Sequence, residues 1–361
     1  MVWIPIRYIR DMTRKALYVA GWLILAAVFW FCSPHMPGRQ GSGDYTVVFY
    51  NVENLYDVFD DPAVNDNEFL PGSKKSWTKE RYSKKLSELA TVLVATGDRN
   101  LPVLIGLGEV ENRKVVEELA VTGGLRKGKY GVVHEDSPDG RGIDVALMYR
   151  QDFFRLLGHQ VVPVILPERN RATTRDILHV WGNAPGGEEM HLFINHWPSR
   201  SGGVQQTERD RIAAARILKG KTDSLYSVNP EMKIIVMGDL NDTPPDRSLQ
   251  EVLGAVHPER KDGAKLVNLM YPAHLRGEGS YYYRGSYDML DNMIVSTGLM
   301  GKEGLSVKNG EGYVFIRDFM TFTNPQGHKV PNRTYVGDRY TGGISDHYPV
   351  YFTLTYLRNI K

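Results

Sequence analysis

Acidic, amide and imidazole side chains recur inside or directly after short apolar runs of this sequence. The residues that share this position are Asn51, Glu53, Glu109, His196, Asp239, Asn241, Asp291, Asp346 and His347. Layered sheets gather the ends of apolar strands at one edge, so these side chains are expected to meet in one cleft. Such a cleft would offer carboxylate, amide and imidazole groups and no thiolate.

These groups suit hydrolysis assisted by a hard divalent cation. Mg²⁺ prefers oxygen ligands and is typically held by one or two carboxylates together with a substrate phosphate. Glu109 suits that role, with Glu53 as a second ligand. Cleavage of a phosphate ester also needs a positioned water, a proton acceptor and donors that meet the charge on the phosphoryl oxygens. A histidine held by a carboxylate, as Asp291 would hold His347, can act as donor, acid or base.

Each residue taken alone also has a structural explanation. An Asn after a strand more often caps a turn than takes part in catalysis. The segment from Asp239 could simply start a turn at Asn241, Asp242 and Pro244. Either histidine could be a buried structural group. Only the joint pattern favours a hydrolytic metal site.

Several short motifs extend this pattern to a family resemblance. They read Asn51-Val52-Glu53-Asn54-Leu55, Gly108-Glu109-Val110, His196-Trp197-Pro198-Ser199, Gly238-Asp239-Leu240-Asn241-Asp242 and Ser345-Asp346-His347-Tyr348-Pro349. In this order, from about residue 45 to residue 357, the chain resembles the endonuclease/exonuclease/phosphatase superfamily, the deoxyribonuclease-I-like fold. The resemblance implies an α/β class, a four-layer α/β/β/α sandwich with two packed mixed β-sheets and the site at one rim.

The resemblance also implies a set of metal-binding residues. Glu109 would be the principal metal carboxylate, with Asn51 beside it as a ligand or a donor to the phosphate. Glu53 stands where members with an Asn-Val-Asp pattern have a second metal carboxylate. Asp346 would lie on or near the metal. The implied cofactor is Mg²⁺, with Mn²⁺ as an alternative.

The catalytic residues follow from the same resemblance. Asp239 would activate the attacking water, and Asn241 would orient the water or the phosphate. His347 would contact the scissile phosphate and would itself be oriented by Asp291. His196 would donate to a phosphoryl oxygen or to the leaving group.

The elements that must position these residues alternate between strand-like and helical patterns. Strands are predicted at 45–50, 103–107, 145–149, 177–181, 192–195, 233–237, 290–295 and 348–356. Helices are predicted at 81–95, 113–119 and 207–219, where apolar residues recur at helical spacing. The pattern indicates a mixed α and β domain.

Composition narrows the class of protein further. Hydrophobic residues make up 42% and charged residues 24% of the 361 positions, which is typical of a folded globular chain and argues against disorder or a polytopic membrane protein. Lys+Arg 44 against Asp+Glu 42 leaves a net charge of only +2, so no chain-wide attraction to nucleic acid is visible. The single cysteine excludes an intrachain disulfide and a metal site built from several thiolates.

Residues 1–32 are predicted to target the chain to a membrane. Residues 16–32 carry no charge, and a basic flank precedes them. The basic residues of that flank are Arg7, Arg10, Arg14 and Lys15. Bulky residues at 29–31 favour an uncleaved anchor over a cleaved signal, and Cys32 leaves acylation as a lipoprotein open. The rest of the chain would then face the periplasm or the cell exterior.

The remaining chain divides into a linker and one domain. Residues 33–43 have the proline and glycine content of a linker, and residues 44–361 form the catalytic domain. The function that these observations favour is a phosphodiesterase of nuclease type, with a phosphate-ester substrate such as nucleic acid.

Other functions stay open from the sequence. A phospholipid or an inositol-type phosphate ester would suit a tethered enzyme, and a non-catalytic binding module would keep the fold without the reaction. The near-neutral charge weakens the case for duplex binding. The run Tyr281-Tyr282-Tyr283 could stack bases or sugars, although alternation in a strand would bury one face. Arg169, Arg171 and Arg175 could contact a substrate phosphate, although most loop arginines are solvated. No protein partner can be inferred.

Overall fold

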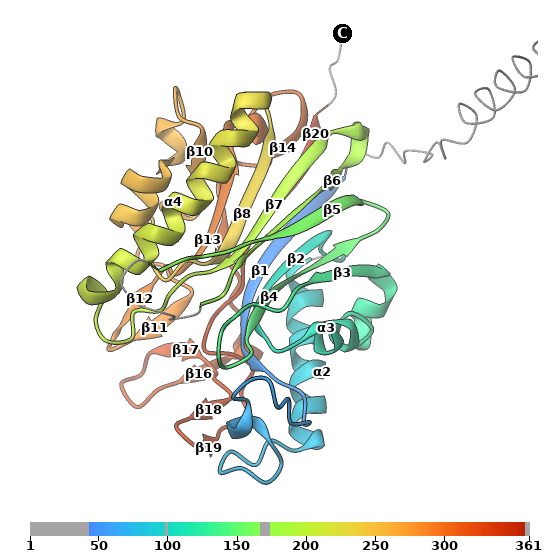
Figure 1. Cartoon of the computed structure of the whole chain (residues 1–361), viewed down its shortest axis with the longest axis vertical. Helices are drawn as coiled ribbons and strands as arrows, with labels where there is room; N and C mark the ends of the chain where they lie inside the picture. Colours follow the sequence, from blue (N-terminus) through green and yellow to red (C-terminus); the bar gives the residue numbers. More distant parts are fainter. Residues whose placement is uncertain (1–42, 98–99, 167–173, 358–361) are drawn as a thin grey trace, which may run out of the picture. The chain divides into compact units, whose positions relative to one another are not determined.

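The computed structural model describes residues 43–97, 100–166 and 174–357, which build two β-sheets with helices on their outer faces (Figure 1). The strands of the first sheet are β1 (Asp44–Leu55), β2 (Leu104–Val110), β3 (Tyr130–His134), β4 (Asp144–Arg150), β14 (Gly304–Val307), β15 (Tyr313–Val314) and β20 (Val350–Leu357). Their order is β14-β20-β1-β2-β4-β3, and β15 also pairs with β20. Because β1 and β2 run parallel and the other pairs antiparallel, the sheet is mixed.

The second sheet is mixed as well. Its strands are β5 (Arg155–Val162), β6 (Ile177–Asn183), β7 (Glu189–His196), β8 (Lys233–Asp239), β9 (Ala255–Val256), β10 (Leu266–Asn268) and β13 (Asp291–Ser296). They follow the order β5-β6-β7-β8-β13-β10-β9, with β7 and β8 parallel at the centre.

Helices and small hairpins complete the fold. The helices are α2 (Lys79–Thr96), α3 (Arg113–Ala120), α4 (Val204–Val228) and α5 (Tyr271–Leu275). The hairpins are β11 (Tyr281–Tyr283) with β12 (Ser286–Asp288), β16 (Thr321–Thr323) with β17 (Lys329–Pro331), and β18 (Tyr335–Val336) with β19 (Arg339–Tyr340). Figure 1 shows these hairpins together at one end of the domain.

The core between the sheets follows from alternation along the strands. Val47 and Phe49 of β1 share one buried cluster with Leu192 and Ile194 of β7 and with Met237 of β8. Successive strand side chains point to opposite faces, so every second residue of these strands reaches the inner layer. Burial of such apolar surface is the main free-energy gain that holds the two sheets together.

The alternate residues of the same strands pack against the helices. Val48 of β1 lies in a cluster with Leu89 of α2 and Val116 of α3, whereas Phe193 of β7 clusters with Leu218 of α4. In Figure 1, α4 crosses the outer face of the second sheet, and α2 and α3 lie beside the first. The predicted mixed class with two mixed sheets is confirmed.

Each strand and helix expected from apolar periodicity overlaps an observed element of the same type. The elements that periodicity did not predict are short or lie at sheet edges. An example is β5, an edge strand whose residues are mostly exposed or half-buried and therefore carry no regular apolar pattern.

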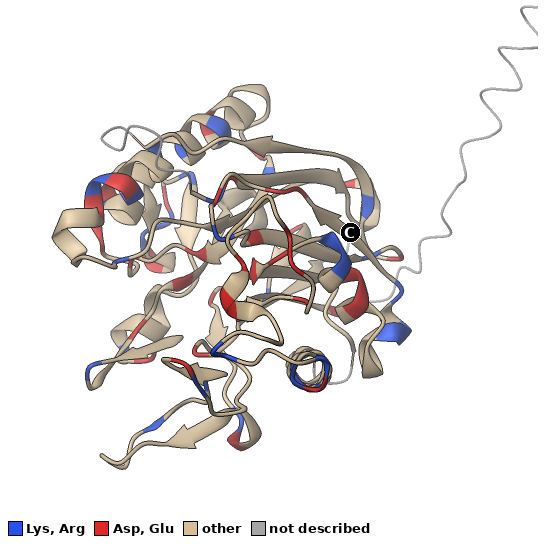
Figure 2. Ribbon diagram, turned by 60° about the horizontal axis from the view of Figure 1, so that its bottom comes forward, with Lys and Arg blue, Asp and Glu red and all other residues tan. Residues whose placement is uncertain are grey.

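The predicted membrane segment at 1–32, the predicted linker up to residue 42, and Arg169 and Arg171 lie outside the described residues. Within the described part of the chain, no helix is both long enough and apolar enough to cross a membrane. Figure 2 shows Lys and Arg interspersed with Asp and Glu over the ribbon, as the balanced charge predicts.

Glu111, beside the end of β1, provides a test of the packing in this region. Burial, with smaller contributions from the carboxylates of Asp57, Asp66 and Asp61, raises the pKa of Glu111 to about 8, although a hydrogen bond from the Asp57 amide at 2.6 Å lowers it. The native state therefore binds an extra proton between pH 4.3 and 8 relative to the unfolded chain, so the free energy of unfolding falls as pH rises through this window.

The substitution Glu111→Gln should remove this loss, because the amide stays neutral and its oxygen still accepts the Asp57 N–H. We expect the variant to match the wild type near pH 5 and to exceed its free energy of unfolding by about 1–2 kcal/mol near pH 9, allowing for partial solvent screening. Urea unfolding across this pH range measures the difference. If the free energy of unfolding depends on pH in the same way for the two proteins, the raised pKa is not that of Glu111.

Candidate active site

The register of the second sheet places three polar side chains in one row. His196 on β7 is the partner of Asp239 on β8, and Asp239 is also the partner of Asp291 on β13. Directly paired residues point to the same face of a sheet. The three buried side chains, which lie far apart in the sequence, are therefore neighbours.

Asn51 and Glu109 reach this row from the first sheet. Asn51 of β1 pairs with Gly108 of β2. Beyond this pair the register of β2 shifts against both of its neighbours, β1 and β4, and Glu109 has a left-handed backbone with φ 63°. Such a bulge turns a side chain out of the normal alternation. The Asn51 Nδ2 donates to Glu109 Oε1 at 3.2 Å and to Asp239 Oδ2 at 3.1 Å. One amide group therefore joins carboxylates from the two sheets.

His347 is held by Asp291 as predicted. The His347 Nδ1 lies 2.6 Å from Asp291 Oδ2, and its Nε2 lies 3.8 Å from Asp239 Oδ2. Burial alone would lower the pKa of His347, but the Asp291 carboxylate, with Asp239 and Asp346, raises this pKa well above its ordinary value. His347 is therefore a cationic donor near neutral pH.

His196 has the opposite electrostatic setting. Burial lowers the pKa of His196 well below its ordinary value, and the positive charges of Arg175, Arg141 and His347 lower it further. Its Nε2 lies 3.6 Å from Asp239 Oδ2 and 4.0 Å from Glu109 Oε1. Asp239 is thus flanked by one neutral and one cationic imidazole.

Asp239 and Asn241 are fixed by the turn that follows β8. The Asn241 backbone N–H donates to Asp239 Oδ1 at 3.0 Å, and the Asn241 Nδ2 donates to the Trp197 carbonyl at 3.1 Å. Burial and the Asp291 charge raise the pKa of Asp239 to about 7. A carboxylate with a pKa near neutrality is well matched to accepting a proton from water.

Glu53 does not follow the expected strand alternation. Glu53 and Asn54 have left-handed backbones, with φ 49° and 55°, so Glu53 does not continue the face of Asn51. Its carboxylate accepts the backbone N–H groups of Thr334 at 2.7 Å and Tyr335 at 3.5 Å. The Asn51 Oδ1 accepts the Glu53 N–H at 3.0 Å, so Asn51 presents its amide nitrogen, not its oxygen, to the carboxylates.

Asp346 lies at the margin of the site. Its side chain is 23% exposed, and the nearest described cationic group is Arg333, whose Nη2 is 3.9 Å from Asp346 Oδ2. The neighbouring Ser345 Oγ donates to the Asn51 carbonyl at 2.7 Å and accepts the His347 N–H at 3.1 Å. This link holds the segment that carries Asp346 and His347 against β1.

Arg175 and Arg141, which are joined through Asp139, support the site from one side, although little in the sequence indicated this role. Arg175 is buried, and its guanidinium pairs with Asp139 Oδ2 at 3.0 Å and donates to the Trp197 carbonyl at 2.7 Å, next to His196. Asp139 also pairs with Arg141 through Nε and Nη2, at 3.2 and 3.1 Å. Asp139 and Arg141 lie in a polar turn, and no sequence signal marked them as functional.

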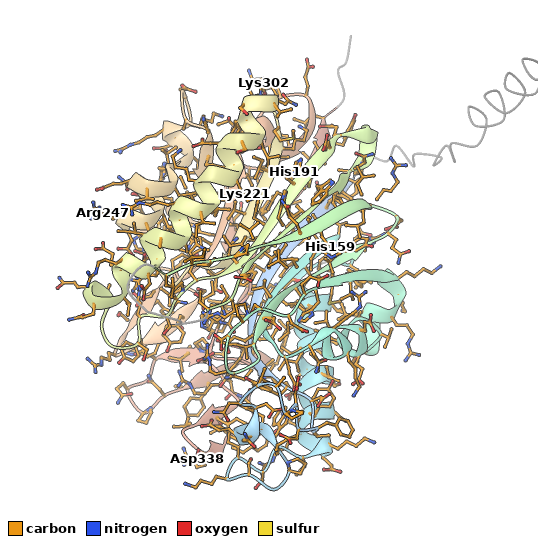
Figure 3. The ribbon with its side chains drawn as sticks, in the orientation of Figure 1. His159, His191, Lys221, Arg247, Lys302 and Asp338 are labelled. Carbon is orange, nitrogen blue, oxygen red and sulfur yellow. The ribbon has the colours of Figure 1, made fainter. Side chains whose placement is uncertain are left out.

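Two histidines labelled in Figure 3 do not join the site. His159 lies on β5, where its Nε2 is 2.7 Å from Glu135 Oε1. His191 lies near the start of β7, where its Nδ1 is 2.8 Å from His179 Nε2. The site instead forms at the far end of β7, where His196 ends the strand.

The groups that converge here fit a hard divalent cation. The predicted residues that the structure brings together are Asn51, Glu109, His196, Asp239, Asn241, Asp291 and His347. Asp239, Asp291 and His347 offer ligand atoms that lie within 4.8 Å of one another, and the buried Asp291 Oδ1 has no hydrogen-bond partner within the described chain. Carboxylate oxygens without sulfur are the donor set that Mg²⁺ or Mn²⁺ accepts.

Comparisons with known proteins agree with this geometry. A family model described as the endonuclease/exonuclease/phosphatase family matches residues 46–356. Truncated Caenorhabditis elegans TDP2 has a TM-score of 0.52 and 15% identity, covering 86% of this chain and 97% of its own. A mannosyl-6-phosphatase from Bacteroides thetaiotaomicron has a TM-score of 0.52 and 16% identity, covering 86% and 100%. The human Nocturnin catalytic domain has a TM-score of 0.51 and 16% identity, covering 87% and 94%. No curated protein matches the chain.

The family match, together with the two-sheet fold, identifies a metal-dependent hydrolase of phosphate esters with a deoxyribonuclease-I-like architecture. The chain belongs to the endonuclease/exonuclease/phosphatase family.

Proposed function

We propose that this protein is a Mg²⁺-dependent phosphodiesterase of nuclease type. The observation that carries the proposal is Asp239 flanked by cationic His347 and neutral His196, opposite the Glu109 carboxylate. Solved structures of similar fold include a D. rerio TDP2 complexed with single strand DNA product, at 15% identity, which supports a nucleic-acid substrate.

The residues divide the work of in-line hydrolysis. Glu109 would hold the cation, with Asp346 on or near it, and the cation would neutralise charge on the phosphate. Asp239 accepts the proton of the attacking water, in a position fixed by the Asn241 N–H. His347 donates to a phosphoryl oxygen as charge develops there. Neutral His196 hydrogen-bonds the phosphate or the leaving group.

A substrate panel tests this proposal. The purified protein should hydrolyse single-stranded DNA or RNA with Mg²⁺ or Mn²⁺ and lose this activity with EDTA. The same panel should contain plasmid DNA, sphingomyelin, an inositol phosphate and mannose 6-phosphate. Turnover of a lipid or a sugar phosphate without turnover of nucleic acid would replace the nuclease assignment by the alternative that the sequence left open.

The His347–Asp291 pair predicts a specific pH dependence. A cationic His347 stays protonated above neutral pH because Asp291 raises its pKa, so activity that needs this proton should persist into the alkaline range. In Asp291→Asn the carboxylate charge is gone, the pKa of His347 falls, and the alkaline limb of the pH–rate profile should move down by at least about one pH unit. If the alkaline limb does not move in Asp291→Asn, the limb reports the titration of a group other than His347.

We also propose that residues 16–32 tether the catalytic domain at the outer face of a membrane. The charge-free run and its basic flank support this orientation. Proteolysis of intact cells tests it, because an exported domain should be digested without lysis. Protection of the domain until lysis would overturn the orientation.

A further inference from the structure

The β11–β12 hairpin is attached directly to the proposed catalytic dyad of His347 and Asp291. Tyr281 forms an isolated antiparallel bridge with His347. The preceding Ser280 accepts the Asp291 N–H through its Oγ at 3.1 Å and the Tyr348 N–H through its carbonyl at 2.8 Å. The base of the hairpin is therefore positioned by the same backbone that positions His347 and Asp291, so its side chains keep a fixed relation to the reacting phosphate.

Alternation along β11 divides its three tyrosines between two faces. Tyr282 is turned to the neighbouring β16–β17 hairpin, where its hydroxyl lies 2.5 Å from His328 Nδ1 and its ring contacts Tyr287. Tyr281 and Tyr283 lie on the other face, with roughly parallel rings whose centroids are 6.4 Å apart. The face that carries Tyr281 and Tyr283 is therefore turned away from the β16–β17 hairpin and toward His347.

The face with Tyr281 and Tyr283 leads outward from the catalytic histidine, His347. The Tyr281 ring centroid lies 4.8 Å from that of His347, and Tyr283, one step farther out, is 50% exposed. The rings of His347, Tyr281 and Tyr283 therefore form a row that runs from the buried His347–Asp291 pair to the surface. A planar group next to the scissile phosphate would meet an aromatic surface here rather than polar side chains.

Cationic groups lie beside this row of rings. The Arg284 guanidinium lies 5.1 Å from the Tyr283 ring centroid, and Arg333 is 3.9 Å from Asp346 and hydrogen-bonds the Tyr281 side chain. A monophosphate has a single phosphate group, which the catalytic centre itself would take. Further cations along an outward path therefore match a substrate that carries additional phosphates, as a polynucleotide does.

We infer that the β11–β12 hairpin is a binding subsite for an unpaired nucleotide next to the scissile phosphate, with Tyr281 and Tyr283 stacking its base and Arg284 and Arg333 meeting neighbouring phosphates. This inference rests on the proposed phosphodiesterase function and narrows its substrate to single-stranded nucleic acid. Bases inside a duplex are already stacked on one another, whereas an unpaired base is free to stack on a tyrosine.

Binding in the absence of catalysis tests the subsite. Anisotropy of a labelled short oligothymidylate with the full chain in EDTA should show about tenfold weaker binding for Tyr283→Ala and wild-type binding, within about twofold, for Tyr283→Phe, because stacking needs the ring and not the hydroxyl. An abasic oligonucleotide of equal length should bind the wild type about as weakly as oligothymidylate binds Tyr283→Ala. Tyr283 is exposed, so these substitutions leave the core intact.

Two further variants separate stacking from charge. Phe59 is also an exposed aromatic residue with a cation, Lys114, 4.6 Å from its ring centroid, but acidic residues surround it in the sequence, so Phe59→Ala should bind like the wild type. Arg284→Gln should weaken binding of normal and abasic oligonucleotides alike and reduce the salt slope by about one phosphate contact.

The outcomes distinguish the subsite from the proposed function. Unchanged binding by Tyr283→Ala, or equal binding of normal and abasic oligonucleotides by the wild type, would overturn the subsite. Tyr283-dependent binding of mannose 6-phosphate but not of oligothymidylate would overturn it as well. Failure of the protein to hydrolyse any phosphodiester would instead refute the proposed function, while the difference between Tyr283→Ala and Tyr283→Phe in binding would still decide whether the hairpin stacks bases.

Discussion

Replacing Asp239 by asparagine should lower kcat on a phosphodiester by about a thousandfold, within the range attributed to general acid–base groups. Asp239 Oδ2 has three nitrogen neighbours, at 3.1 Å on Asn51, 3.6 Å on His196 and 3.8 Å on His347. An asparagine keeps the size of the side chain but cannot accept the proton of the attacking water. The NH₂ group of the asparagine would also face N–H donors of these neighbours, from which it cannot accept a hydrogen bond. Steady-state kinetics with saturating Mg²⁺ measures the effect.

A nearby carboxylate provides the matched control. Asp246 lies seven positions later, accepts the Thr243 N–H at 2.6 Å and pairs with Arg200 at 2.8 Å. Asp246→Asn makes the same chemical change close to the site, and its kcat should stay within about threefold of the wild type, because the contacts of Asp246 are to Thr243 and Arg200 and not to the proposed catalytic groups. Equal losses in the two variants would show that Asp239 acts through the stability of the turn and not through proton transfer.

Glu109→Gln should give the second large effect, a loss of metal response. The bulge at Glu109 turns its carboxylate toward Asn51 and His196, and replacing this proposed ligand by a neutral amide removes the charge that a hard cation needs. We expect the Mg²⁺ concentration for half-maximal activity to rise by at least about tenfold, with kcat falling by about a hundredfold or more. A Mg²⁺ titration of activity, and calorimetry of Mn²⁺ binding, measure the two quantities.

Glu53→Gln is the informative comparison for Glu109→Gln. The Glu53 carboxylate accepts backbone N–H groups of Thr334 and Tyr335, and burial, together with the charge of Asp346, raises its pKa to about 7. A glutamine can still accept one of these hydrogen bonds. We therefore expect the half-maximal Mg²⁺ concentration of Glu53→Gln to stay within about threefold of the wild type. A tenfold rise would establish Glu53 as the second metal ligand that the family resemblance implies.

The accuracy of the sequence prediction differs between the elements and the site. Apolar alternation is a local property, so the runs 45–50 and 233–237 were sufficient to predict β1 and β8, and the polar residues at their ends were sufficient to predict that these side chains lie together. Alternation failed at Glu53, because a left-handed backbone there depends on packing against Thr334 and Tyr335, which lie far away in the sequence.

The roles of the histidines required the tertiary structure. His196 and His347 look equivalent in the sequence, yet burial among Arg175 and Arg141 keeps one neutral, and the Asp291 carboxylate keeps the other charged. Local patterns in the sequence were enough to predict the main strands and to single out side chains of the types that bind a metal and a phosphate. The partners and protonation states of these side chains emerged from the folded arrangement, because desolvation and Coulomb interactions depend on distances between residues that the chain brings together on folding.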